Sequence, residues 1–194
     1  MMFFKPYQVF NLIITLVSLL VCMWLSLVRI PGVELFEITP NWVLIWLVSW
    51  SIKRSLLEAV VGGLCCGLML DGLTVSEPSH IFPFVIVAVL TVFIYKRIIK
   101  KIQEDFISVA LIVFGMAILV EFIRSLQLIN FQFSDFSQFV ANFQQFVADF
   151  QQFWQHQQRA ALLTAIMSSL WLGVIYLPLN RWWAFIKPSN QLKS

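Results

Sequence analysis

Few side chains in this sequence could do chemistry, and they stand far apart. The carboxylates Glu58 and Glu121 lie near the ends of apolar stretches, each within four positions of a basic residue that could pair with it. His156 has polar neighbours, which favours a solvated histidine over a metal ligand. The sequence contains no Ser/His pair, His-x-x-Glu-His, Walker loop or Cys-x-x-Cys. We therefore expect a protein that is not an enzyme and holds no cofactor or metal.

The three cysteines offer no metal or redox site. Cys22, Cys65 and Cys66 all lie in apolar runs, and the adjacent pair lacks the spacing of metal ligands. We expect all three to be small, buried packing residues.

The most distinctive segment runs from Gly62 to His80, an apolar stretch with regular glycines that ends on an aspartate and a turn. Gly63 and Gly67 are four residues apart, and this spacing lets another helix approach closely. The partner is either a helix of the same chain or a helix of another subunit. Asp71 and Gly72 then either bond to exposed backbone and start a turn, or contact a partner.

The composition requires a bilayer around the chain. Of the 194 residues, 60% are hydrophobic and 12% are charged, and the mean hydropathy is +0.84. A soluble domain of this size could not bury so much apolar surface. The length suits one membrane domain, residues 1–194, with about six helices of roughly 20 residues each. A formal charge of +3 is too small to indicate nucleic acid. We therefore predict an all-α polytopic membrane protein with six transmembrane helices.

The predicted spans follow the apolar runs, which are 9–28, 38–52, 55–73, 81–95, 106–123 and 160–177. We expect Thr39 and Pro40 to begin the second helix as N-cap and first-turn residue, and Pro178 to close the sixth. Trp42, Trp46 and Trp50 form one aromatic face of the second helix. That run is short enough for a re-entrant segment, but the charge pattern favours a crossing.

Basic residues give the orientation. Six crossings with a cytoplasmic N-terminus place ten of the thirteen basic residues inside, and leave Arg29, Arg124 and Arg159 outside. The positive-inside rule is then satisfied at every loop. We predict a multi-pass protein of the bacterial inner membrane with both termini cytoplasmic.

Residues 130–159 carry three consecutive heptads with aromatic and aliphatic residues on one side and glutamines on the other. The stripe includes Phe139, Phe143, Phe146 and Phe150. We predict an extracytoplasmic amphipathic helix that lies on the outer leaflet, docks on a partner or self-associates.

One segment resembles a known family. A Pro-led second helix, a hairpin into the third, and Gly-Leu-x-x-Asp-Gly-Leu-Thr are similar to MreD, the rod-shape-determining membrane subunit of the bacterial cell-elongation machinery. The residues that carry the resemblance are Pro40, Gly63, Gly67, Leu68, Asp71, Gly72, Leu73 and Thr74. It covers about residues 38–95. The continuation from Val75 to His80 departs from the common family pattern and resembles cyanobacterial versions.

The resemblance implies a non-enzymatic scaffold that acts in peptidoglycan synthesis. Its implied partners are MreC, a bitopic protein with a large periplasmic domain, and through it RodA, a penicillin-binding transpeptidase and MreB. The implied fold is similar to the substrate-binding subunits of energy-coupling-factor vitamin transporters. The alternative is therefore a small-molecule binding subunit with polar groups in an outward cavity. Candidates for that cavity are Asp71, Glu77, His80 and Asn130.

Overall fold

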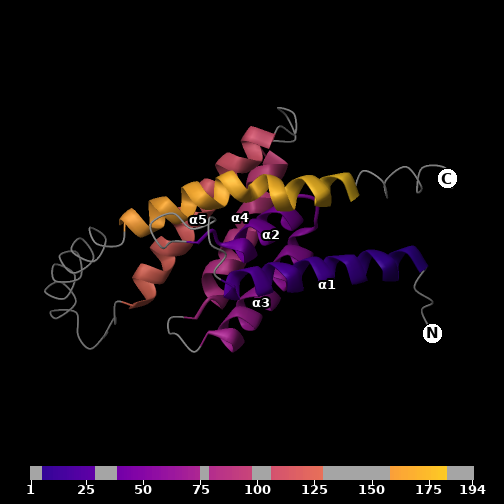
Figure 1. Ribbon diagram of the computed structural model, residues 1–194, viewed down its shortest axis with the longest axis horizontal. Helices are drawn as coiled ribbons and strands as arrows, with labels where there is room; N and C mark the ends of the chain where they lie inside the picture. Colours follow the sequence, from indigo (N-terminus) through magenta and orange to yellow (C-terminus); the bar gives the residue numbers. More distant parts are fainter. Residues whose placement is uncertain (1–5, 29–38, 75–78, 98–105, 129–157, 183–194) are drawn as a thin grey trace, which may run out of the picture.

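The computed structural model describes residues 6–28, 39–74, 79–97, 106–128 and 158–182. Within these ranges, every regular element is an α-helix. The helices are α1 (Pro6–Leu27), α2 (Trp42–Ser51), α3 (Leu56–Leu73), α4 (Ile81–Arg97), α5 (Phe106–Leu128) and a last helix, Gln158–Trp182, which we call the C-terminal helix (Figure 1). The expected all-α fold is confirmed.

Four of these helices are long and apolar enough to cross a membrane, namely α1, α3, α5 and the C-terminal helix. α4 has 17 residues and α2 only 10. At about 1.5 Å per residue, α2 is roughly 15 Å long, half the thickness of a hydrocarbon core. Membrane-spanning character is therefore supported for four helices, and the six crossings stay a prediction.

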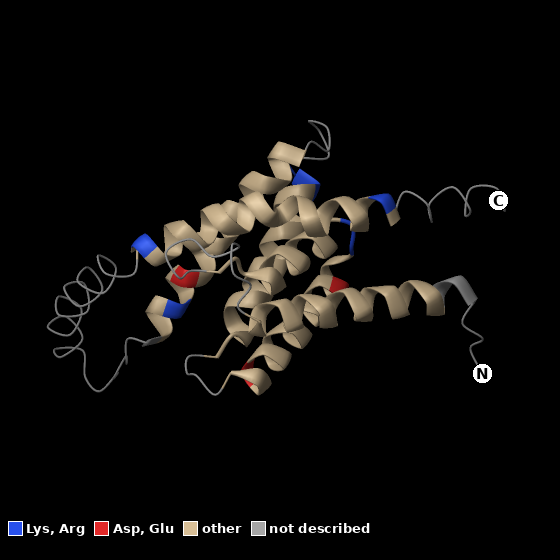
Figure 2. Cartoon of the chain, viewed as in Figure 1, with Lys and Arg blue, Asp and Glu red and all other residues tan. Residues whose placement is uncertain are grey.

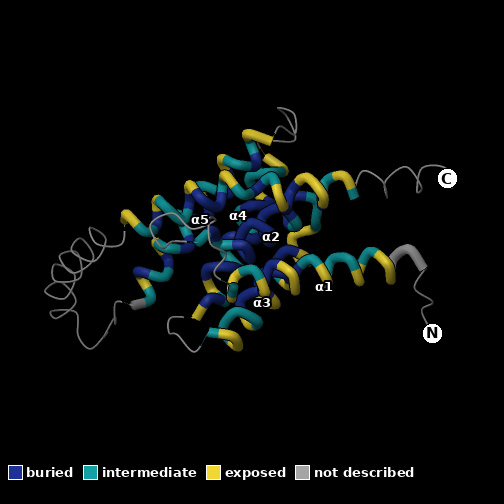
Figure 3. The backbone as a smooth tube through the Cα atoms, in the orientation of Figure 1, coloured by how far each residue is buried: buried dark blue, intermediate teal, exposed yellow. Residues whose placement is uncertain are grey.

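The shortest of the described helices, α2, lies at the centre of the described bundle. Every residue from Val43 to Val48 is at most 2% exposed, and α2 packs against α1, α3, α4 and α5. Figure 3 shows α2 in dark blue, among helices with exposed outer faces. α2 is apolar on all sides, as expected of a helix that other helices surround. The predicted aromatic face is divided between neighbours, because Trp42 packs edge-on against Trp171 while Trp46 and Trp50 stack on each other.

Contacts at both ends of α2 fix its depth along the C-terminal helix. The Asn41 backbone N–H donates to Ser168 Oγ at 3.0 Å, and Lys53 Nζ donates to Asn180 Oδ1. Ser168 lies near the middle of the C-terminal helix and Asn180 near its end. α2 therefore begins at mid-depth and runs to one end of the bundle.

The start of α2 differs from the prediction. The N-cap is Asn41, whose Oδ1 accepts a hydrogen bond from the Leu44 N–H at 3.0 Å, so the expected cap at Thr39 is wrong. Asparagine is as good a cap as threonine, and the contact with Ser168 holds Asn41 in place.

Two helices end five residues later than predicted. The C-terminal helix continues through Pro178 to Trp182 instead of ending there, and α5 extends to Leu128 rather than 123. Transmembrane helices tolerate proline, because neighbouring helices, hydroxyl side chains and ordered waters can satisfy the backbone groups that it frees. Cys65 is exposed, while Cys22 and Cys66 are buried, so the packing role predicted for all three cysteines is wrong for Cys65.

The third helix begins as expected after Lys53 and Arg54, but its cap was not foreseen. Ser55 is the N-cap of a capping box, in which Ser55 Oγ accepts from the Glu58 N–H and the Glu58 carboxylate accepts from the Ser55 N–H. The Glu58 side chain is thus part of the cap. The Arg54 guanidinium lies 5.0 Å from the centre of the Trp50 ring, which is a cation–π contact.

Candidate functional site

The glycines of α3 lie against the backbone of α4. A Cβ atom on Gly63 would come within 2.9 Å of Phe84 O and Val85 Cα, and one on Gly67 within 2.5 Å of Ile81 Cα. Distances this short leave no room for any side chain. The two glycines therefore serve a contact within the chain, between α3 and α4.

Asp71 joins the end of α3 to the start of α4. Its Oδ1 accepts from the His80 backbone N–H at 2.7 Å, and its Oδ2 accepts from the Ser79 hydroxyl at 2.6 Å. His80 Nδ1 also lies 2.7 Å from Oδ1, where it donates when the carboxylate is ionised. His80 is 6% exposed, and its backbone carbonyl accepts from the Phe84 N–H at 3.2 Å, in the first turn of α4. One carboxylate thus fixes the position at which α4 begins.

The other two glycines of the segment have different surroundings. A Cβ on Gly62 would lie 2.5 Å from the Trp50 ring, so this glycine makes room for a side chain of α2. Gly72 is exposed, and a Cβ atom at this position would meet nothing within 4 Å. Three glycines of α3 were predicted to form an interface, and of these only Gly72 faces open space.

A stripe of exposed residues lies on α3, opposite the glycine face. Leu57, Val61 and Leu68 are each at least 58% exposed. Cys65 and Gly72 are exposed at the same helical spacing. We call these five residues the outer stripe of α3. Its two small residues would allow another helix to approach closely at those points.

A polar pocket of about 380 Å³ lies beside the start of α2. Its walls come from the ends of α1, α3 and α5, the start of the C-terminal helix, and the residues before α2. The lining residues are Ser26, Thr39, Pro40, Asn41, Leu70, Glu121, Ala160 and Thr164. The pocket sits here because α2 begins only at mid-depth, so the other half of the bundle centre is not filled by α2.

Hydroxyl, amide and carboxylate groups give this pocket a polar lining. The Ser26 hydroxyl donates to the Cys22 carbonyl at 3.0 Å, and Asn41 Oδ1 is occupied by the α2 cap. Glu121 Oε1 lies 4.0 Å from Arg124 Nη1, so the pair expected from the sequence forms, although with a long contact. Across the described ranges, no three His, Cys, Asp or Glu residues gather as metal ligands.

Of the predicted cavity residues, the two that the structure describes, Asp71 and His80, do not line this pocket. Asp71 and His80 bind each other at the turn between α3 and α4, and Glu77 and Asn130 lie outside the described residues. The four phenylalanines of the predicted amphipathic helix, Phe139, Phe143, Phe146 and Phe150, also lie outside them. Asn41, Ser26 and Thr164 were missed. Asn41 alone gave a signal, as a good N-cap residue directly before an apolar run.

Comparisons of the chain with protein-family models, curated proteins and solved structures found no match.

Proposed function

We propose that this protein is a non-enzymatic scaffold subunit of the bacterial cell-elongation machinery, of the MreD kind, that binds an MreC-like bitopic partner in the inner membrane. The support comes from the resemblance of residues 38–95 together with the structural roles of the residues that carry it. Gly63 and Gly67 bring α3 and α4 together, and Asp71 fixes their turn. Thr74 ends α3 by donating through its N–H and its hydroxyl to the Leu70 carbonyl.

The observation that carries the proposal is the outer stripe of α3. The hairpin uses one face of α3 for α4 and leaves the opposite face, including Leu68 and Gly72, exposed. A transmembrane helix of an MreC-like protein would pack on this stripe. RodA-like, transpeptidase and MreB partners would then join through that protein.

Copurification tests this proposal. The tagged full chain, extracted in mild detergent from its own host, should bring down a bitopic protein with a large periplasmic domain. Leu68→Trp, in the middle of the stripe, should reduce the recovered partner by at least about tenfold, equivalent to roughly 1.4 kcal/mol. Leu111→Trp is the matched control, because Leu111 is 71% exposed on α5, away from the stripe. Equal recovery with both variants would rule out the stripe as the interface.

The polar pocket favours a second candidate function, a small-molecule binding subunit of a membrane transporter. Such sites combine a few directed polar groups with apolar walls, and Asn41, Glu121 and Thr164 supply the polar groups here. Native mass spectrometry of the purified chain should then show a bound small molecule. Thr164→Val should remove that molecule, whereas Thr74→Val, outside the pocket, should not. A chain that copurifies with transporter ATPases instead of a bitopic protein would favour this second function.

A further inference from the structure

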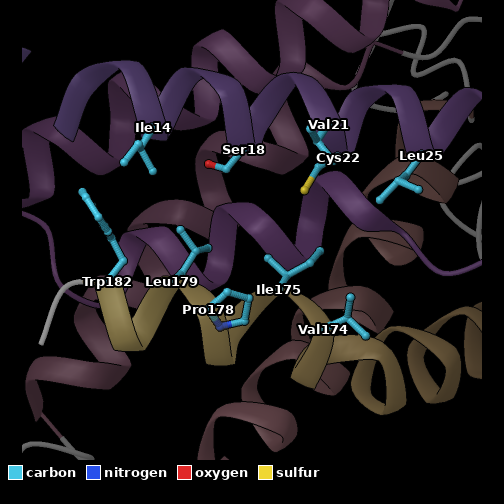
Figure 4. A pocket seen from close by; sticks show the side chains of 10 residues that line it. All are labelled: Ile14, Ser18, Val21, Cys22, Leu25, Val174, Ile175, Pro178, Leu179 and Trp182. Atoms are coloured by element: carbon cyan, nitrogen blue, oxygen red, sulfur yellow. The ribbon is translucent and has the colours of Figure 1, made fainter. Parts of the chain in front are cut away.

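An apolar groove separates α1 from the C-terminal helix. It measures about 400 Å³ and is lined by Ile14, Ser18, Val21, Cys22, Leu25, Val174, Ile175, Pro178, Leu179 and Trp182. In Figure 4, the labelled side chains of the two helices face each other across this space. Val21 and Val174, one from each wall, are 49% and 55% exposed, so the groove opens to the surroundings of the bundle.

The described walls of the groove present no unpaired hydroxyl group to an occupant. Among the described residues that line it, Ser18 has the one hydroxyl, and this hydroxyl is already hydrogen-bonded. It donates to the Thr15 carbonyl at 2.8 Å and accepts from the Trp46 indole N–H at 2.9 Å. A hydrocarbon therefore fits these walls without leaving a buried polar group unpaired.

The groove is too small to enclose a helix. A cylinder about 10 Å wide and only 15 Å long already occupies about 1,200 Å³, three times the space available. Close helix contacts in membranes also rely on glycine, alanine or serine, whereas these walls are mostly branched or aromatic. A single flexible hydrocarbon chain fits both the size of the groove and its apolar walls.

One end of the groove carries groups that suit a lipid headgroup. Trp182 lies there, edge-on to Phe10 at 5.4 Å between ring centres, with its indole N–H 3.4 Å from Asn11 Oδ1. Tryptophan favours the membrane–water interface. Arg181 is exposed next to it, one turn beyond Pro178 of the groove wall. A cation at this position attracts anionic headgroups.

From these observations we propose that the groove binds one acyl chain of an anionic phospholipid, whose phosphate lies beside Arg181 and Trp182. The chain lies between α1 and the C-terminal helix and fills the gap that direct packing leaves open. This inference requires only that the two helices lie in a bilayer, and it is independent of the scaffold function.

Photo-crosslinking tests the site. The full chain is reconstituted into phosphatidylcholine vesicles that contain a phosphatidylglycerol with a diazirine on one acyl chain. Labelling of Val21 and Val174 should exceed labelling of Leu20 by about tenfold, equivalent to roughly 1.4 kcal/mol of preference. Leu20 is the matched control, since it is 55% exposed on the other face of α1. Uniform labelling would indicate ordinary surrounding lipid and overturn the proposal.

Two pairs of variants test the two ends of the lipid separately. Leu25→Trp fills the groove and should abolish the enrichment, while Leu20→Trp should keep it. Arg181→Gln should remove the preference for phosphatidylglycerol over a phosphatidylcholine probe, whereas Arg159→Gln, at the opposite end of the C-terminal helix, should not. A specific crosslink between two copies of the chain through Val21 would show that a protein occupies the groove, and would also overturn the proposal.

Discussion

The Asp71 carboxylate holds three groups at the start of α4, and the roles of its two oxygens can be separated by substitution. Asp71→Ala leaves the His80 N–H, in a residue that is 6% exposed, without its acceptor. An unpaired buried donor costs about 1–3 kcal/mol. We expect a lower unfolding temperature for this variant in detergent, measured by the loss of the folded fraction on heating.

Asp71→Asn provides the matched comparison. The asparagine Oδ1 can still accept from the His80 backbone, but its Nδ2 cannot accept from the Ser79 hydroxyl. Its loss of stability should therefore be smaller than that of the alanine variant. If the asparagine variant is as stable as the native chain yet loses its copurifying partner, the charge of Asp71 acts in a contact outside this hairpin.

Residue types alone indicated a turn at Asp71 but did not reveal its bonding partners. An aspartate at a helix end commonly bonds to nearby backbone, and this was one of the two interpretations of Asp71 and Gly72. The sequence could not show that the acceptor would reach nine residues ahead to His80. That contact depends on the path of the turn, and no local spacing rule encodes it.

At the scale of elements, the glycine face makes the α3–α4 hairpin sensitive to single methyl groups. Gly67→Ala would place a Cβ 2.5 Å from the Ile81 backbone, so the two helices must separate. Overpacking of this kind costs about 1–3 kcal/mol. We expect a clear fall in thermal stability in detergent for Gly67→Ala.

Gly72→Ala and Gly115→Ala are the controls, because nothing lies within 4 Å of a Cβ at either position. Both should be as stable as the native chain or slightly more stable, since alanine favours helix over glycine by up to about 1 kcal/mol. If Gly67→Ala is tolerated as well as these two, the close α3–α4 contact is wrong.

The glycine spacing predicted a close helix contact but could not identify the second helix. A Gly-x-x-x-Gly step is the same whether its partner is in the chain or in another subunit. The predicted cap at Thr39 was wrong for a similar reason, because threonine and asparagine are both acceptable N-cap residues. The contact of Asn41 with Ser168, 127 residues away in sequence, helps to position this end. Local signals thus located the helices well and their partners poorly.

The predicted amphipathic helix, residues 136–154, lies outside the described residues. A multiple substitution and a peptide experiment test whether it forms. Changing Phe139, Phe143, Phe146 and Phe150 to serine removes about 1.5–3 kcal/mol of favourable burial free energy per side chain. We expect faster proteolysis within this segment while the rest of the chain stays protected. A peptide of residues 136–154 should become helical on neutral vesicles or with the extracytoplasmic partner. If it does neither, the predicted helix is wrong.

At the scale of the whole molecule, side-chain contacts place the starts of α1 and α5 on the same side of the bundle as the end of the C-terminal helix. The start of α1 meets the end of the C-terminal helix through Asn11 and Trp182, and Phe106 at the start of α5 contacts Tyr176. Figure 2 shows the charged segments toward the helix ends, with uncharged residues between them. This arrangement is the one that apolar helices need in a bilayer, where charges are costly at depth.

The same-side placement of these ends agrees with an even number of passages through the bundle between α1 and the C-terminal helix. It does not decide which side faces the cytoplasm, and that prediction depends on the ten-to-three division of basic residues. The sequence could predict orientation from charge, because the rule needs only loop composition. It showed that the second apolar run is short, but it could not predict that the helix would begin only after Asn41, because that start depends on a contact with the distant Ser168.

Cysteine labelling from outside the cell tests the orientation at two exposed, described positions on either side of α5. In a variant whose three native cysteines are replaced by alanine, Gln158→Cys should react with a membrane-impermeant maleimide in intact cells. Arg97→Cys should react only after the membrane is permeabilised, because the basic end of α4 is predicted to be cytoplasmic. The reverse pattern would show that the chain is inverted. Reaction at both positions in intact cells would place both ends of α5 on one side, and would contradict the crossing that its 23 residues suggest.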